Sequence, residues 1–150
     1  LYLTNIRPIL EYASELWDPY QQYLINDIES IQNRSARFVL NSYNWRQSVT
    51  ALKEELKWEL LQTRRKCLRL KLLHAIHYEL SGIDKGTYLL EPHFISQRRD
   101  HSRKIRPFSS KTDIFKHSFF PSTIQSWNEL PEELVLEKNN SNIFQALLGL

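Results

Sequence analysis

Two long segments with apolar residues at helical spacing constrain the fold of this chain more than any other feature of its sequence. In the first, from about residue 21 to residue 40, apolar side chains recur every three or four residues. The positions expected to be buried are Leu24, Ile25, Ile28, Ile31, Ser35, Phe38 and Val39. Arg34 and Arg37 lie three residues apart on the opposite side, so both are expected to be exposed. Asn41 marks the expected end of this helix.

The second segment predicts a longer helix, from about residue 59 to residue 80, ended by Gly82. Its expected inner line consists of Leu61, Leu68, Leu72, Leu73, Ile76 and Leu80. The residues expected to face away from that line are Arg64, Lys71, His74 and Tyr78. Arg65 and Arg69 project toward the core, where a carboxylate such as Glu29 is a candidate partner for Arg65.

Two shorter helices complete this part of the chain. One is expected through residues 8–17 and ends at Asp18-Pro19, because a residue before proline is pushed out of the helical region. The other is expected over residues 48–56, with Ser48 as its cap. Several amphipathic helices with short connections predict a mainly α fold, in which residues 1–82 form an antiparallel helical bundle.

The remaining residues show a weaker pattern. Helical periodicity is lost over residues 83–117, which predicts an irregular basic segment with candidate short strands at 88–90 and 104–106. Residues 83–88 are the candidate hinge. Residues 118–150 predict a small helical tail that packs on the bundle, so that the whole chain forms one structural unit.

Single positions in the tail and among the tryptophans carry further expectations. Pro121 suits the first turn of one tail helix, in which Trp127 and Leu130 are buried. Ser141 caps the last helix, whose inward residues are Ile143, Phe144 and Leu147. Trp17 and Trp58 are expected to pack in the core, whereas Trp45, in a polar loop, is expected to be partly exposed.

The charge of the chain is unevenly distributed. The net charge is only +3, but eleven Lys and Arg stand against four acids between Arg64 and Arg106, a balance of +7. The rest of the chain carries −4. A segregated basic region is typical of a protein with a polyanionic partner.

The densest basic stretch is the candidate nucleic-acid site. Its members are Arg98, Arg99, Arg103, Lys104 and Arg106, with His101 among them and Phe94 and Phe108 on either side. Lys and Arg bind phosphates, while aromatic side chains stack on unpaired bases. The helical positions expected to add to this surface are Arg34, Arg37, Arg64 and Lys71. The alternatives are a solvated basic surface, or ion pairs to the chain's own acids.

No catalytic constellation is recognisable. The chain has five aspartates and none is adjacent to another, so the paired aspartates that hold two Mg²⁺ ions in a polymerase are missing. Cys67, His74 and His77 are too few and too poorly aligned for a zinc site. His101 and His117 lie in basic, aromatic surroundings, where a phosphate or base contact is more natural than a metal. We therefore expect no enzyme activity, cofactor or small-molecule substrate for this chain alone.

Four stretches together resemble the carboxy-terminal, post-palm region of reverse transcriptases from non-LTR retrotransposons, the jockey-like LINE elements. They are RPILEYASELWDPY, IQNRSARFVLN, RDHSRKIRPFSSKTD and FKHSFFPSTIQSWNELP. The likeness spans essentially the whole chain in the same order. It departs from the family at Lys57, where glycine is common, and at Ser35, where alanine is.

This resemblance implies a parent RNA-directed DNA polymerase whose Mg²⁺ ions belong to a separate polymerase domain. The first helices would belong to its thumb, which holds a template–primer duplex by the backbone. The implied partners are RNA or DNA, or both, and the upstream polymerase domain, in the nucleus and cytoplasm. The absence of methionine and the apolar start at Leu1 fit a piece of a longer protein. No apolar run or signal region suggests a membrane or secreted protein.

Two other functions stay open at this point. The chain could be a helical protein–protein interaction scaffold, whose basic stretch docks on an acidic protein surface without binding nucleic acid. An independent enzyme is the least favoured, because the residues for catalysis cannot be assembled from the sequence.

Overall fold

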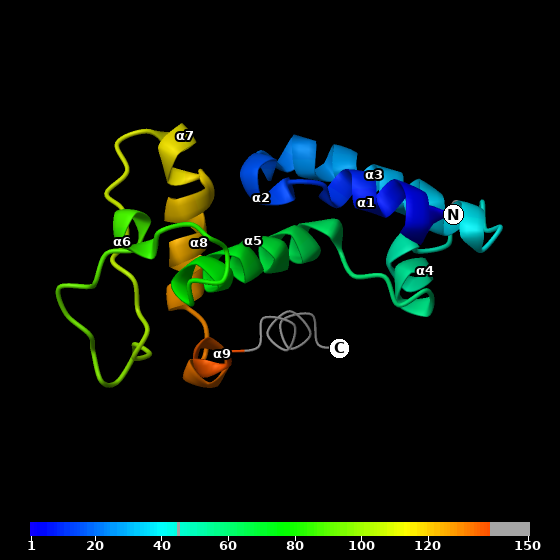
Figure 1. The fold of residues 1–150 in the computed structure, drawn as a ribbon. Helices are drawn as coiled ribbons and strands as arrows, with labels where there is room; N and C mark the ends of the chain where they lie inside the picture. Colours follow the sequence, from blue (N-terminus) through cyan, green and yellow to red (C-terminus); the bar gives the residue numbers. More distant parts are fainter. Residues whose placement is uncertain (45, 139–150) are drawn as a thin grey trace. The chain divides into compact units, whose positions relative to one another are not determined.

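The computed structural model describes residues 1–44 and 46–138, and over these residues the chain is mainly helical (Figure 1), as the sequence predicts. The order of elements is η1 (Tyr2–Ile6, a π-helical turn), α1 (Arg7–Glu11), α2 (Ser14–Trp17), α3 (Gln22–Val39), α4 (Val49–Glu55), α5 (Leu61–His77), α6 (Lys85–Tyr88), α7 (Asp113–Lys116), α8 (Phe119–Asn128) and α9 (Glu132–Leu136). Predictions for Trp45 and for the helix capped by Ser141 lie outside the described residues.

The described residues contain no strand, so the strands predicted at 88–90 and 104–106 are wrong. The two segments are nevertheless neighbours, because the Arg106 N–H donates to the Leu90 carbonyl at 2.9 Å. Tyr88 itself ends α6. One backbone hydrogen bond does not make a ladder, so the two segments do not form a sheet.

Backbone contacts divide the chain into two compact units, Leu1–Arg65 and Lys66–Leu150. The division falls within α5, whereas the sequence suggested one after it. Whether residues 1–82, 83–117 and 118–150 behave as separate domains stays a prediction.

In the first unit, the predicted limits of the main helix are confirmed, but its predicted buried face is confirmed only at Ile25. α3 begins and ends within a residue of the predicted limits. Its buried residues are Ile25, Gln32 and Ala36, while Phe38 is 66% exposed and Val39 50% exposed. The predicted first helix is broken, because Ala13 adopts a left-handed backbone between α1 and α2. Trp17 is 40% exposed, so its predicted place in the core is also wrong.

Polar contacts hold much of the first unit together. Arg64 forms a paired hydrogen bond and ion pair with Glu11, and the buried Arg65 Nε donates to Asp18 at 2.7 Å. The predicted partner of Arg65, Glu29, instead lies 3.8 Å from Lys53 and accepts a hydrogen bond from the Gln62 backbone. A partner 47 positions away in sequence could not be found from helical spacing.

Aromatic stacking adds a smaller apolar contact to this unit. Tyr2 is buried and stacks on Trp58 with ring centroids 4.3 Å apart. The guanidinium of Arg7 lies over both rings, 5.5 Å and 5.9 Å from their centroids. Burial raises the pKa of Tyr2.

Three helices end in the same way, on a residue with left-handed backbone that is not glycine. Asn41, Lys57 and Glu79 have φ of 48°, 54° and 59°. In each case the next amide donates to the carbonyl five residues back, at 2.9 Å, 2.8 Å and 2.7 Å, which is the Schellman arrangement. The last residue of α5 is therefore His77, and the left-handed residue that follows it is Glu79 and not the predicted Gly82. Lys57 likewise occupies a conformation that favours glycine.

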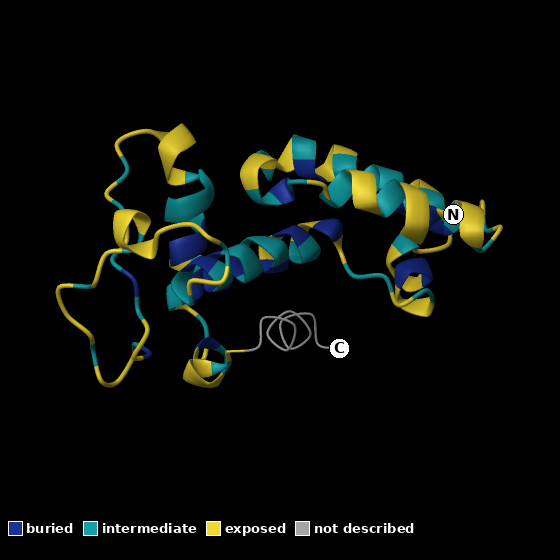
Figure 2. Cartoon of the chain, in the orientation of Figure 1, coloured by how far each residue is buried: buried dark blue, intermediate teal, exposed yellow. Residues whose placement is uncertain are grey.

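The second unit has a continuous apolar core. Its buried residues are Leu70, Leu73, Ile105, Ile124, Trp127 and Val135. In Figure 2 the buried positions of α5 and α8 are dark blue. Trp127 is fully buried and Leu130 packs against the cluster, as predicted.

The inner face of α5 agrees with the predicted one at Leu61, Leu73 and Ile76, which are buried, and differs from it elsewhere. Leu68 and Leu72 are only partly buried and Leu80 is 62% exposed, whereas His74, predicted to face away, is buried. Its Nε2 is 2.7 Å from the Glu137 carbonyl oxygen, and the Tyr78 hydroxyl donates to Val135 at 2.7 Å. His74 and Tyr78 can thus be accommodated here because backbone carbonyls in and beside α9 form hydrogen bonds with them.

A search of the described residues for a membrane-crossing helix found none that is both long and apolar enough.

Candidate nucleic-acid interface

The basic strap, residues 98–106, is held by its backbone to the end of α8. The Trp127 Nε1 donates to the Arg103 carbonyl at 3.0 Å, and His101 Nε2 lies 3.0 Å from the Trp127 carbonyl oxygen. Asn128 makes two further bonds to Ile105, accepting its N–H at 2.9 Å and donating to its carbonyl at 2.8 Å. Four hydrogen bonds therefore fix the path of a segment that has no helix or strand of its own.

A turn places two buried side chains of the strap on either side of exposed ones. His101 and Ile105 are 5% and 3% exposed and point into the second unit, whereas Arg103 between them is exposed. His101 is thus a core residue, which corrects its predicted role as a phosphate or base contact. Residues 101–104 form a turn, closed by the Lys104 N–H donating to the His101 carbonyl at 3.3 Å, and Ser102 and Arg103 at its tip are exposed.

The five basic side chains of the strap are not equivalent. Arg98, Arg99 and Arg103 are exposed, and in the part of the chain that the structure describes their side chains have no ion pair or hydrogen bond. Lys104 pairs with Asp100 at 2.7 Å, and this hydrogen bond lowers the pKa of Asp100. The Nε of Arg106 donates to the Glu91 carbonyl at 2.9 Å. Three cations are therefore free to meet a ligand, and two are engaged within the protein.

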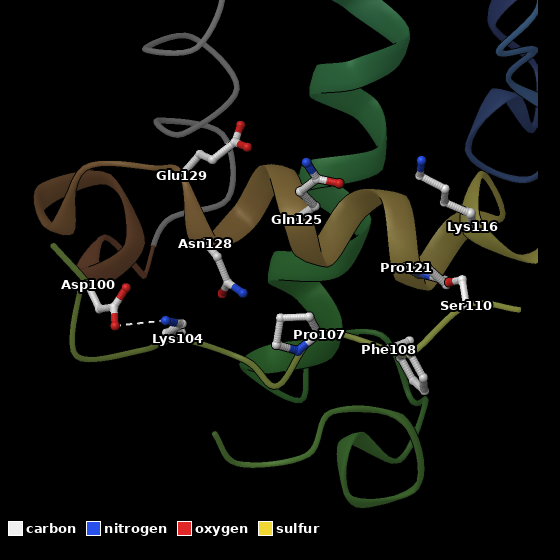
Figure 3. Close-up of a pocket in the computed structure, with 10 residues that line it drawn as sticks. All are labelled: Asp100, Lys104, Pro107, Phe108, Ser110, Lys116, Pro121, Gln125, Asn128 and Glu129. Carbon is white, nitrogen blue, oxygen red and sulfur yellow. Dashed lines mark ion pairs between the residues drawn. The ribbon is translucent and has the colours of Figure 1, made fainter. Parts of the chain in front are cut away.

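A cavity of about 640 Å³ is lined by residues of the strap, by the residues after it and by α8, as Figure 3 shows. Lys104 and Phe108 lie on one side, and Lys116, Gln125 and Asn128 on the other. Lys116 is exposed. It lies in the FKHSFF stretch, which contributes to the family resemblance. It was not predicted as a site residue because it is distant from the strap along the chain.

Two of the helical residues predicted to extend this surface, Arg37 and Arg64, are engaged in contacts within the protein. Arg37 donates through Nη1 to the carbonyls of Ser42 and Asn44 at 3.4 Å and 3.1 Å, and through Nη2 to Gln47 at 3.3 Å. It holds the loop after α3 and is not a free cation. Arg64 is occupied by Glu11.

Arg34 and Lys71 differ from these two. Arg34 is exposed, with Nε 3.4 Å from the Ser30 carbonyl oxygen, and Lys71 is partly buried. Lys71 belongs to the same compact unit as the strap, whereas Arg34 belongs to the other unit. Arg34 is therefore the one helical arginine of the predicted set that is left on an exposed surface.

The histidines and the cysteine form no metal site. Among residues 1–44 and 46–138 no three His, Cys, Asp or Glu side chains are placed to share an ion. Cys67 is buried, and burial lowers the pKa of both His74 and His77. His117 is partly buried.

The residues that sequence reasoning missed are the anchors, Trp127 and Asn128. Trp127 was predicted to be buried, but nothing in its spacing shows that its indole N–H reaches the strap. Asn128 gives no signal at all, because one amide side chain can serve either a turn or a partner far along the chain.

Comparison of the chain with models of protein families, with curated proteins and with solved structures gave no match in any of the three.

Proposed function

We propose that this chain is the non-catalytic, post-palm region of a non-LTR retrotransposon reverse transcriptase, and that it binds nucleic acid through phosphate contacts of the basic strap. The observation that carries the proposal is the exposure of Arg98, Arg99 and Arg103, which have no ion pair within the described part of the chain. Bonds to α8 anchor residues 101–105 of this segment, and a turn between Ser96 and Asp100 holds the residues before them. A preorganised row of cations loses little conformational freedom when it meets a polyanion.

Two features support the proposal from different sides. Lys57, the position at which the family commonly has glycine, adopts the left-handed backbone that glycine favours. The strap also offers cations without a base-reading element, which suits binding that tolerates any sequence. The lack of paired aspartates in the sequence supports the non-catalytic part of the proposal.

Fluorescence anisotropy with unrelated single-stranded and duplex oligonucleotides over a salt series tests the binding. Replacing Arg98, Arg99 and Arg103 with alanine should weaken binding equally for all sequences. The slope of log K against log salt should fall by about two on single strands and nearly three on duplex. A matched control replaces Lys57, Lys66 and Lys111, three exposed lysines outside the strap, and removes the same charge.

Equal losses of affinity in the triple arginine variant and in the lysine control would mean that binding depends on the net charge of the chain and not on the strap. If the unsubstituted chain fails to bind any oligonucleotide at about 50 mM salt, the proposal is wrong. Primer extension in Mg²⁺ by the chain alone would contradict its non-catalytic part.

A second candidate function, a protein-interaction scaffold, is favoured by the exposed apolar residues of the first unit. Ile9, Tyr12 and Leu16, on or beside α1 and α2, are 73%, 79% and 77% exposed. Exposed apolar residues that gather on neighbouring elements are typical of a protein contact, and the upstream polymerase domain is the partner that the resemblance implies. Co-expression with that domain, with Leu16→Lys as the disrupting variant and Gln22→Lys as the control, tests this reading.

A further inference from the structure

A second cavity in the Lys66–Leu150 unit combines four cations with an apolar wall. Its volume is about 410 Å³, within the usual range for small-molecule sites. The charged and polar residues around it are His77, Tyr78, Glu79, Lys85, Glu91, Arg103, Lys104 and Lys138. Leu89, Leu90 and Ile105 supply the apolar wall.

The charges of this cavity are only partly balanced. Lys85 pairs with Glu79 at 2.9 Å, but both side chains are largely exposed, and Lys104 pairs with Asp100 at 2.7 Å. Arg103 and Lys138 have no ion-pair partner in the part of the chain that the structure describes. Glu91 also lines the cavity, so the four cations stand against Glu79, Glu91 and Asp100. The cavity therefore keeps an excess of positive charge, which an anion would neutralise.

His77 reports the same imbalance. Burial is the main cause that lowers its pKa to about 4, and Arg103, Lys85, His74 and His101 lower it further. Its ring lies 5.4 Å from that of Trp127 and 5.0 Å from that of Tyr78, so it is held on one side of the cavity. At neutral pH the ring of His77 is therefore neutral, because burial and the nearby cations disfavour its protonated form.

We propose that this cavity binds a nucleoside monophosphate, either free or as the terminal nucleotide of a strand, with the phosphate against Lys85, Arg103 and Lys138. The apolar wall of Leu89, Leu90 and Ile105 accommodates the uncharged part of the ligand. For a strand end, this inference rests on the proposed function, whereas binding of a free nucleotide does not.

The test follows His77 by NMR while adenosine monophosphate is added to the whole chain. Because the phosphate is an anion beside His77, the pKa of His77 should rise by about one to three pH units at saturation. Inorganic phosphate should produce the same change at higher concentration, because it lacks the apolar contact. A His77 pKa that stays at its starting value with saturating nucleotide overturns the proposal.

Two lysine variants separate this cavity from general charge effects. Lys85→Ala combined with Lys138→Ala should weaken nucleotide binding at least about ten-fold, the effect of losing charge-assisted contacts to phosphate. Lys111→Ala with Lys66→Ala removes the same charge elsewhere and should change nothing. All four lysines are exposed, so folding should be retained, which circular dichroism checks. Equal affinity in the two double variants overturns the assignment.

Oligonucleotides with and without a 5′ phosphate distinguish this inference from the proposed function. Tighter binding of the phosphorylated strand, lost in the Lys85/Lys138 double variant, places a strand end in the cavity. If no oligonucleotide binds but adenosine monophosphate still raises the pKa of His77, the strap proposal fails and the cavity is a site for free nucleotides.

Discussion

The two compact units of this chain are stabilised by different kinds of contact. In Leu1–Arg65, ion pairs join elements that are distant in sequence, and Gln32 and Arg65 are both fully buried. In Lys66–Leu150, an apolar cluster around Trp127 joins α5, α8, α9 and the basic strap.

This difference determines how each unit responds to change. A buried ion pair tolerates replacement of both partners by apolar residues but not the loss of one, because one charge is then left without compensation. An apolar cluster is insensitive to charge but leaves a cavity when a large side chain is shortened. The four predictions below, from the largest expected effect to the smallest, test whether the contrast holds.

The largest effect is expected from Trp127→Ala in the second unit. Loss of a fully buried indole should lower the free energy of unfolding by about 3–5 kcal/mol. It also removes the hydrogen bond to the Arg103 carbonyl, so the strap should lose order. Denaturant unfolding followed by circular dichroism measures the loss, with the half-exposed Trp17→Ala as the control. Similar losses of unfolding free energy in the two variants would contradict the proposed difference between the two units.

A smaller loss, about 3 kcal/mol, is expected from Arg65→Met in the first unit, because the largely buried Asp18 loses its ion pair with Arg65. Replacing Asp18 with leucine in the same variant should restore most of the stability. A double-mutant cycle on unfolding free energies checks this. If the double variant is less stable than the single one, the pair stabilises this unit in a way that apolar contact cannot replace.

Acidification should weaken the second unit through His77. Its pKa is lowered to about 4 in the folded state, against about 6.5 when unfolded. Stability from the neutral ring is therefore complete above about pH 6.5, and is lost as pH falls toward about 4, where the loss levels off. Because His77 is only partly buried, we expect about 1–2 kcal/mol. The difference in unfolding free energy between the parent and His77→Gln should shrink over that window, and a constant difference would contradict the prediction.

The smallest effect is a gain, from Lys57→Gly at the end of α4. Lys57 is exposed and has φ of 54°, a conformation that costs a side-chain-bearing residue about 1 kcal/mol more than glycine. Thermal unfolding should show about 0.5–1 kcal/mol of added stability for glycine and none for Lys57→Ala. Glu79→Gly should gain less, because it also loses the ion pair with Lys85.

Helix limits could be predicted from this sequence better than helix faces. Residues before Asp18-Pro19 and around Asn41 carry local signals, since proline and a left-handed Asn act on their own backbone. The faces of α3 and α5 depend on partners that are distant in the chain. Ile31 and Leu72, which the spacing placed in the core, are only partly buried, while Gln32 and His74, which it did not, are buried.

The candidate site shows the same limit. The strap arginines could be found because a run of cations needs no partner to be conspicuous. Arg37 and Arg64 are also cations at helical spacing, yet Arg37 donates hydrogen bonds to a loop and Arg64 binds Glu11. What a cation does is decided by the nearest carbonyl or carboxylate, and sequence spacing contains no information about that when the partner lies tens of residues away.

The anchoring of the strap to α8 also bears on how such a surface can change over generations. Trp127 and Asn128 grip main-chain atoms of residues 103 and 105, which every amino acid except proline supplies in full. Outward positions such as 102 and 103 can therefore accept new side chains while the route of the segment stays the same. A lineage could exchange its ligand here by point substitution, without inventing a new scaffold.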